Sequence, residues 1–344
     1  MESSVELNKS IPLLALVEPA EMQELLPVLQ PVKLEAGQVL FRENTPGEGM
    51  WILGDGTEVS ISQSRGKRPV VIATNKAGET VGEMALIDGG PRSGAAVVTQ
   101  AGRAFYISAT DFRALREAYR PGAFKVMRQI CHELCSRLRA TSDRVAPSQV
   151  TAPPSQAQSA GRRPSEAEID EFGPFITLPQ VVKLALCQKL QSVEVAPGEA
   201  ICLEGEQGEH AYFLISGEVQ VTRNRQMLHR MRPGAMFGMV SVIDEGRRSA
   251  TCAALSAVRL LRLSKPDFDH LFMAGNRFAF QMVDLVSRQL VGQLRSANQL
   301  ISGSNSEPLS RGTDPNRPVG LEALPEMLPL ELEIELSLEE ALHP

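Results

Sequence analysis

The chain of 344 residues has no run of apolar residues long enough to cross a membrane, since about 20 consecutive ones are needed. Its first residues, from Met1 to Glu6, are acidic and polar and lack the basic and apolar regions of a secretory signal. The five cysteines show no paired spacing, so no disulfide framework is predicted. These absences predict a cytoplasmic protein that does not enter a membrane.

Catalytic and metal-binding patterns are also missing. The five histidines are scattered and lack the spacing of metal ligands. No nucleophile elbow, phosphate-binding P-loop or kinase signature is present. Cys131 and Cys135 lie four residues apart on a predicted helix; we interpret them as a packed helix face, with a redox or metal site as the alternative. The sequence therefore predicts a protein that is not an enzyme and holds no metal or permanent cofactor.

Positive charge is scarce as well. The formal net charge is −6, and the segment after Ser302 carries nine acidic and two basic residues. The rest of the chain is therefore close to neutral, and it offers no basic surface for nucleic acid. The sequence predicts that DNA is not a partner.

The most informative segment runs from Val81 to Ser93 and reads V-G-E-M-A-L-I-D-G-G-P-R-S. Gly82 allows the backbone to approach a ligand closely, and a helix that begins at Glu83 directs N–H groups toward an anion. Glu83 can accept a hydrogen bond from a sugar hydroxyl, and Arg92 offers a planar fork that suits phosphate oxygens. An ordinary surface ion pair between Glu83 and Arg92 is the alternative. The candidate ligand-binding residues are Gly82, Glu83, Met84, Ala85, Arg92 and Ser93.

This segment resembles the phosphate-binding cassette of the cyclic nucleotide-binding domain family, which includes protein kinase A regulatory subunits, catabolite activator proteins and cyclic nucleotide-gated channels. The residues that match the family pattern in register are Gly82, Glu83, Ala85, Leu86, Ile87, Pro91, Arg92, Ser93 and Val97. The resemblance implies cAMP or cGMP as the ligand, without a choice between the two. It also implies that the phosphate binds Arg92 and the cassette N–H groups, while the ribose 2′-hydroxyl binds Glu83.

The module occurs twice in the chain. The cassette is echoed by Phe237 to Ser249, and the segments before it are echoed in the same order. The second copy has Met239 at the position of Glu83, and methionine cannot accept a hydrogen bond from a ribose hydroxyl. Its remaining candidate site residues are Gly238, Arg248 and Ser249. We expect this second, degenerate site to be weakened, altered in ligand or purely structural; Arg247 beside Arg248 leaves a more anionic ligand open.

Short strand candidates recur at regular spacing around each cassette, and helical patterns follow them. We predict an α+β fold of two tandem jelly-roll β-barrels of the cyclic nucleotide-binding type, each with flanking α-helices. The predicted domains are a first cyclic nucleotide-binding domain over residues 1–145, a Pro/Ser/Gln-rich linker over 146–165, a second domain over 166–302 and an acidic, mostly disordered tail over 303–344.

Two segments outside the barrels admit more than one interpretation. Arg162-Arg163-Pro164-Ser165 is similar to the basic motif by which protein kinase A regulatory subunits block their kinase, but it lies between the domains and is followed by Glu166. We interpret it as a solvated linker. Residues 330–338 alternate leucine or isoleucine with acidic residues, which is typical of a strand added to a sheet edge or of a solubilising tail.

These observations predict a cyclic nucleotide sensor that controls a protein partner, with a kinase as one candidate. Ligand closure of the cassette would shift Leu86 or Ile87 and let the helices after Ser108 fold over the base. Tyr119 and Phe124 are candidates for capping the base, whereas Trp51 and Tyr212 are expected in the barrel cores. The alternative is an interaction scaffold whose barrels no longer bind a ligand.

Overall fold

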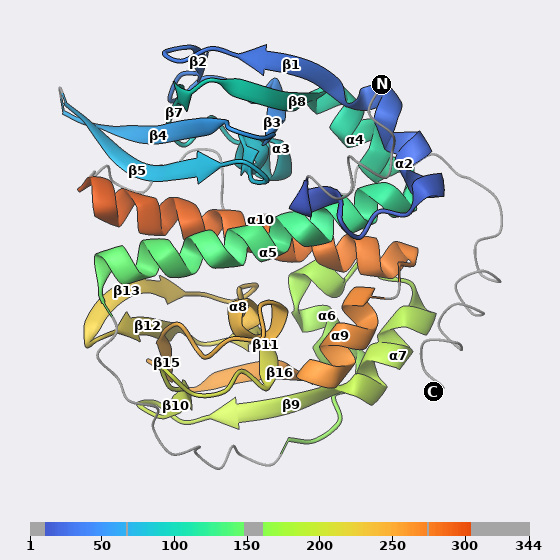
Figure 1. Ribbon diagram of the computed structural model, residues 1–344. Coiled ribbons are helices and arrows are strands. Elements are labelled where there is room, and N and C mark those ends of the chain that lie inside the picture. The colour runs from blue at the N-terminus through green and yellow to red at the C-terminus, as the bar shows by residue number, and fades with distance from the viewer. Residues whose placement is uncertain (1–10, 67, 148–160, 274, 304–344) are drawn as a thin grey trace. The chain divides into compact units, whose positions relative to one another are not determined.

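The computed structural model describes residues 11–147 and 161–303, except residues 67 and 274. They form two compact units, one for each repeat (Figure 1). Unit 1 consists of the described residues up to Thr141 together with those from Leu290 onward, and unit 2 consists of Ser142–Gln289. The boundary falls inside helix α10 (Arg277–Ser302), so the second half of this helix groups with the first barrel rather than with the second repeat.

Unit 1 contains eight strands in two four-stranded antiparallel sheets, ordered β1-β8-β3-β6 and β2-β7-β4-β5. The strands are β1 (Gln30–Leu34), β2 (Val39–Phe41), β3 (Gly49–Leu53), β4 (Glu58–Arg65), β5 (Arg68–Lys76), β6 (Thr80–Val81), β7 (Ala95–Gln100) and β8 (Gly102–Ser108). In β7, Ala96 and Val98 are buried while their neighbours are not, which is the alternation of a strand with one face on the core. The predicted jelly roll is present.

The core of this barrel is built from small and branched aliphatic side chains. Its buried members are Leu34, Leu53, Val59, Val81, Ala96, Val98 and Ala104. Trp51 packs against this cluster, in agreement with its predicted position in the barrel core.

Helices cover the ends of the first barrel. They are η1 (Pro12–Leu14), α2 (Pro19–Leu25), η2 (Leu26–Val28), α3 (Glu83–Asp88), α4 (Ala109–Glu117) and α5 (Pro121–Val145). The Ser108 hydroxyl accepts a hydrogen bond from the Asp111 N–H and so caps α4, while Pro121 begins α5, where its fixed φ suits the first helical position. Phe124 is buried on α5, and Tyr119 lies in the turn between α4 and α5.

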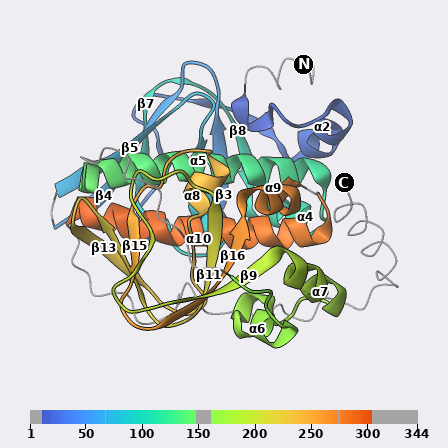
Figure 2. The same ribbon diagram turned by 90° about the horizontal axis from the view of Figure 1, so that it is seen from below.

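Unit 2 repeats this plan with sheets ordered β9-β16-β11-β14 and β10-β15-β12-β13. The strands are β9 (Leu190–Val195), β10 (Ala200–Cys202), β11 (His210–Ser216), β12 (Val219–Arg223), β13 (Gln226–Met231), β14 (Met236–Phe237), β15 (Thr251–Ala254) and β16 (Val258–Ser264). The remaining helices are α6 (Glu166–Glu171), η3 (Gly173–Phe175), α7 (Gln180–Lys189), α8 (Met239–Ile243) and α9 (Lys265–Met273). Figure 2 shows α6 and α7 side by side at the start of this unit. Tyr212 is fully buried in its core, as predicted.

The basic segment between the repeats is exposed at Arg162, Arg163 and Ser165 but makes specific contacts with unit 2. Arg162 exchanges backbone hydrogen bonds with Ser192 of β9, and its guanidinium donates to both carboxylate oxygens of Glu168. Ser165 caps α6 and forms a reciprocal capping box with Glu168. Local capping and strand pairing thus hold these residues against unit 2. The alternating segment 330–338 lies outside the described residues.

No helix among the described residues is long and apolar enough to cross a membrane. Cys131 and Cys135 are buried on α5, and burial raises the pKa of the Cys131 thiol to about 12. They form a packed helix face, as interpreted from their spacing.

Candidate functional site

The cassette begins with a sharp turn that only glycine adopts without strain. Gly82 has a φ of 93° and lies at the N-terminus of α3. A Cβ atom at this position would lie 2.5 Å from Nη1 of Arg92. Gly82 is therefore required both by its backbone conformation and by the close approach of the arginine.

Arg92 is held inside this turn and is only 3% exposed. Its Nη1 donates to the Gly82 carbonyl and its Nη2 to the Gly49 carbonyl, each at 2.6 Å. The guanidinium carbon lies 4.2 Å from the centre of the Phe41 ring, a cation–π contact. Burial lowers the pKa of Arg92, and the nearby Glu83 carboxylate opposes this change. The Nε group is buried and has no hydrogen-bond partner within the described part of the chain.

Glu83 is buried beside Arg92, but its hydrogen-bond partner is a residue of α5. Its Oε1 accepts a hydrogen bond of 2.6 Å from Nη1 of Arg137, and this contact is also an ion pair. Its Oε2 is buried and finds no hydrogen-bond donor among the residues that the structure describes. An unsatisfied buried carboxylate oxygen costs about 1–3 kcal/mol, so this oxygen favours a ligand that brings a hydroxyl donor.

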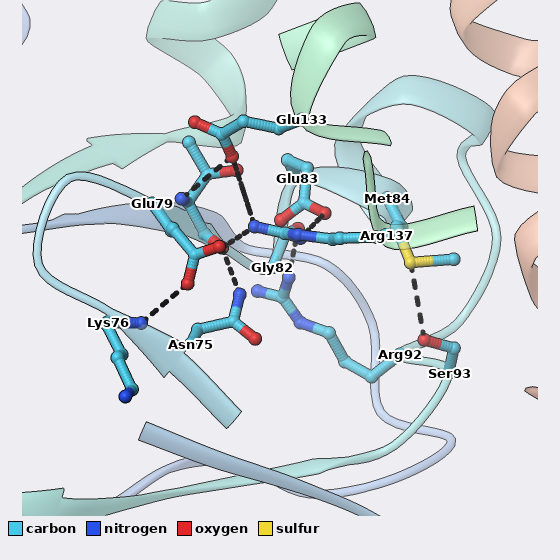
Figure 3. Close-up of polar contacts among 11 residues, drawn as sticks. Asn75, Lys76, Glu79, Gly82, Glu83, Met84, Arg92, Ser93, Glu133 and Arg137 are labelled. Atoms are coloured by element: carbon cyan, nitrogen blue, oxygen red, sulfur yellow. Dashed lines mark hydrogen bonds and ion pairs between the residues drawn. The ribbon is translucent and has the colours of Figure 1, made fainter. Parts of the chain in front are cut away.

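Arg137 and Glu133 connect α5 to the start of the cassette (Figure 3). Arg137 Nη2 donates to the Thr80 carbonyl at 2.6 Å and to Glu133 Oε2 at 3.1 Å, while the Thr80 N–H and hydroxyl both donate to that same oxygen. Burial alone would lower the pKa of Arg137, but the carboxylates of Glu83 and Glu133 outweigh it and raise the pKa. Burial raises the pKa of Glu133. We call Glu83, Glu133 and Arg137 the charged cluster.

The other end of α3 is held by a second helix. Arg295, in the half of α10 that groups with unit 1, donates through Nε and Nη2 to the two oxygens of Asp88, at 2.6 and 3.0 Å. Both ends of the cassette helix are therefore tied to long helices by buried or half-buried ion pairs.

The remaining predicted residues lie along the same turn. The Ser93 hydroxyl donates to the Met84 sulfur at 3.8 Å. Ala85 packs against Gly47, because a Cβ atom added at Gly47 would lie only 2.6 Å from the Ala85 Cβ. Gln63 of β4 donates to the Ser93 carbonyl at 2.5 Å, and its buried Oε1 lacks a partner among the described residues. The predicted site residues thus converge, and the structure adds Gln63, Glu133 and Arg137. No motif marks these three, because their proximity depends on how β4 and α5 pack.

A cavity of about 410 Å³ lies on the α4 side of the cassette helix. Its lining includes Leu86 of α3, Pro46 from the loop before β3, and Phe112, Arg113 and Arg116 of α4. Neither Glu83 nor Arg92 lines it. Their polar groups are packed within the barrel, so the cradle is closed in this structure.

The second cradle keeps the arginine but changes its surroundings. Arg248 donates to the carbonyls of Gly238 and His210 at 2.9 and 2.7 Å, and also to the hydroxyl of Ser241, which stands at the position of Ala85. Met239 is buried where the first repeat has Glu83, and Ser249 follows Arg248 half-buried. Arg247 is exposed and donates to the Gly205 carbonyl. Its exposure gives no support to a second phosphate-binding arginine at Arg247.

The loss of Glu83 in the second repeat extends to the whole charged cluster. The spacing that relates Arg92 to Arg248 places Gln289 and Gln293 at the positions of Glu133 and Arg137. Neutral residues thus stand at all three positions in the second repeat, where one charge without its partner would be costly to bury.

The described residues thus form two jelly-roll barrels, each with a glycine turn wrapped around a buried arginine. The chain matches the cyclic nucleotide-binding domain over residues 31–119 and 192–274. It therefore belongs to the cyclic nucleotide-binding domain family.

Similar proteins include regulators of two kinds. The chain is 22% identical over 244 residues to a cAMP-dependent protein kinase regulatory subunit of Blastocladiella emersonii, covering 70% of this chain and 51% of that protein. It is 28% identical over 111 residues to a CRP-like cAMP-activated global transcriptional regulator of Mycobacterium tuberculosis, covering 31% of this chain and 50% of that protein. The chain spans about half the length of these curated relatives.

A solved structure of the regulatory domain of Toxoplasma gondii protein kinase A with cAMP is 17% identical. The match covers 76% of this chain and 88% of that one, with a TM-score of 0.29.

Proposed function

We propose that the first repeat binds a purine 3′,5′-cyclic mononucleotide, cAMP or cGMP, and that binding changes the position of α5 to regulate a partner protein. The family supports a cyclic nucleotide as the ligand. The names of relatives that are kinase regulatory subunits make a kinase one candidate partner. The second repeat has a structural or altered role in this proposal.

The observation that carries the proposal is the double role of Glu83. One carboxylate oxygen is bound by Arg137 of α5, and the other is buried without a described partner next to Arg92. A ribose hydroxyl would satisfy the second oxygen, and a cyclic phosphate would take the unused N–H groups of Arg92. The Glu83 carboxylate would then accept hydrogen bonds from both the ribose hydroxyl and Arg137 of α5.

Coupling follows from this shared group. Arg92 is buried against Phe41 and the Gly49 carbonyl, so a nucleotide enters only if the cassette moves relative to the barrel. Since Glu83 is bound to Arg137, movement of the cassette changes the contact that holds α5. A ligand shifts this equilibrium only as far as its affinities for the two arrangements differ.

Trp51 makes a direct test possible, because it is the single tryptophan of the chain and its ring centre lies 5.9 Å from the Arg92 guanidinium. We expect Trp51 fluorescence to change on titration with cAMP or cGMP, and calorimetry to give one site per chain. Arg92→Ala should weaken binding at least about tenfold, the value of one charge-assisted hydrogen bond.

The matched control is Arg248→Ala in the second cradle, which should leave this affinity unchanged. Because Arg92 also holds the Gly82 turn, Glu83→Gln provides a second variant that keeps the size of the side chain. Two sites per chain would refute the reading of the second cradle. No binding of either nucleotide, or equal loss in Arg92→Ala and Arg248→Ala, would refute the proposed sensor.

The alternative is a scaffold whose barrels bind no nucleotide. Met239 and the two glutamines at the other positions of the charged cluster favour this role for the second repeat. The intact Glu83 and Arg92 favour the sensor for the first repeat.

A further inference from the structure

Two cysteines lie directly opposite each other inside the second barrel. Cys202 at the end of β10 is the ladder partner of Cys252 of the antiparallel strand β15, next to a β-bulge between Ala200 and Cys202. Both are reduced, belong to the buried core of the barrel and are 4% and 6% exposed. Their proximity is invisible in the sequence, where 49 residues separate them.

The backbone geometry of this pair suits a disulfide. Opposed residues of antiparallel strands have Cα atoms about 4.5–5.5 Å apart, and disulfides span Cα distances of about 4.4–6.8 Å. Closing the S–S bond therefore needs no movement of one strand along the other.

The site also distinguishes the two thiols chemically. The neighbouring Cys252 thiol and the positive charge of Arg248 lower the pKa of Cys202, whereas the neighbouring Cys202 thiol and burial raise the pKa of Cys252. A thiolate is the reactive form of cysteine, so these opposite directions favour Cys202 as the nucleophile and Cys252 as the resolving thiol.

The first repeat shows that the barrel does not need these thiols. Phe41 and Ala96 form the equivalent pair, in register between β2 and β7. The Phe41 ring packs on Arg92, whereas the second repeat has a thiol at the Phe41 position and Arg248 lies over the Tyr212 ring at 5.4 Å.

We propose that Cys202 and Cys252 are a peroxide-sensitive dithiol that closes to a disulfide beside Arg248. The Cys202 thiolate attacks one oxygen of hydrogen peroxide, the O–O bond breaks, and hydroxide leaves and takes up the proton that the thiol released. The Cys252 sulfur then attacks the Cys202 sulfenic acid, the S–O bond breaks and a second water leaves. Overall, two thiols and one peroxide give one disulfide and two waters, and a small dithiol reverses the reaction.

The test uses the full chain treated with stoichiometric hydrogen peroxide and then denatured in the presence of a maleimide. We expect two of the five thiols to escape labelling, the mass to fall by two hydrogen atoms, and peptide mapping to join Cys202 to Cys252. Dithiothreitol should restore five thiols. Cys187→Ser, a half-buried cysteine on α7, is the control that should keep the cross-link.

The single variants test the assigned roles. Cys252→Ser should stop at the Cys202 sulfenic acid, which a dimedone probe labels, whereas Cys202→Ser should give no label at residue 252. A cross-link that survives either substitution, or an oxidised chain that keeps five free thiols, would overturn the proposal. Preferential oxidation of Cys187 would do the same. The result does not depend on nucleotide binding, because all readouts are made on the thiols.

Discussion

The charged cluster predicts a large and specific loss of stability when Arg137 alone is replaced. Arg137→Gln removes the ion pair with Glu83 at 2.6 Å and the contact with Glu133 at 3.1 Å. Glu83 and Glu133 then lose the cation that they share, and Arg92 is the cation that remains beside Glu83. Breaking a buried pair from one side costs about 3–5 kcal/mol, and we expect the lower end because the Arg137 side chain is still 16% exposed.

The second repeat supplies the compensating variant. The combination Glu83→Met, Glu133→Gln and Arg137→Gln copies Met239, Gln289 and Gln293. This triple variant removes all three charges together, and uncharged replacement of a whole buried network is often close to neutral. We therefore expect its free energy of unfolding to lie within about 1–2 kcal/mol of that of the parent protein.

The assay is urea unfolding followed by Trp51 fluorescence, since the single tryptophan lies in β3 and reports on the first barrel. The control is Arg120→Gln, which removes a more exposed ion pair with Glu24 at 3.4 Å and should cost less than about 1 kcal/mol. The reasoning fails if Arg137→Gln costs no more than Arg120→Gln. It also fails if the triple variant is as unstable as the single one.

Two further results follow from the same structure. Gly82→Ala should destabilise unit 1 and weaken nucleotide binding, because it adds backbone strain at a φ of 93° and a close contact with Arg92. The control is Gly37→Ala, where φ is 85° and no atom lies within 4 Å of the added Cβ. This control should show the backbone strain alone and should bind nucleotide normally in the same fluorescence titration. The hydrogen bonds from Arg162 hold the pKa of Glu168 at about 2 instead of its ordinary 4.5, so the contribution of the carboxylate is complete above pH 4.5 and is lost as the pH falls toward 2. The protection factors of the α6 amides, which compare the measured exchange with the intrinsic rate at each pH, should therefore fall over that range in the parent protein, and a similar fall in Glu168→Gln would contradict this explanation.

Much of the fold follows from local patterns in the sequence. Short strand candidates at regular spacing predict the barrels, and the structure has eight short strands in each described unit. Pro121 marks the start of α5, and the repeated order of motifs predicts a second barrel with the same sheet order. These features depend on residues close together in the chain, so they can be inferred without knowing the packing.

The cassette is local in the same sense. Gly82, Glu83 and Arg92 lie within one turn and one short helix, and their chemistry identifies the arginine-centred cradle from the sequence. Met239 likewise marks the second cradle as altered.

Only the tertiary structure decided which residues, distant in the sequence, contact these side chains. Arg137 reaches Glu83 across 54 positions, Gln63 reaches Ser93 across 30, and Cys202 faces Cys252 across a strand pair. Arg162, expected in a solvated linker, is bound to Glu168 and β9. Each of these contacts depends on the relative placement of whole elements, which is set by the packing of many side chains together. The sequence by itself therefore determined the family, the repeats and the cradle arginine, while packing determined which charges and thiols act with it.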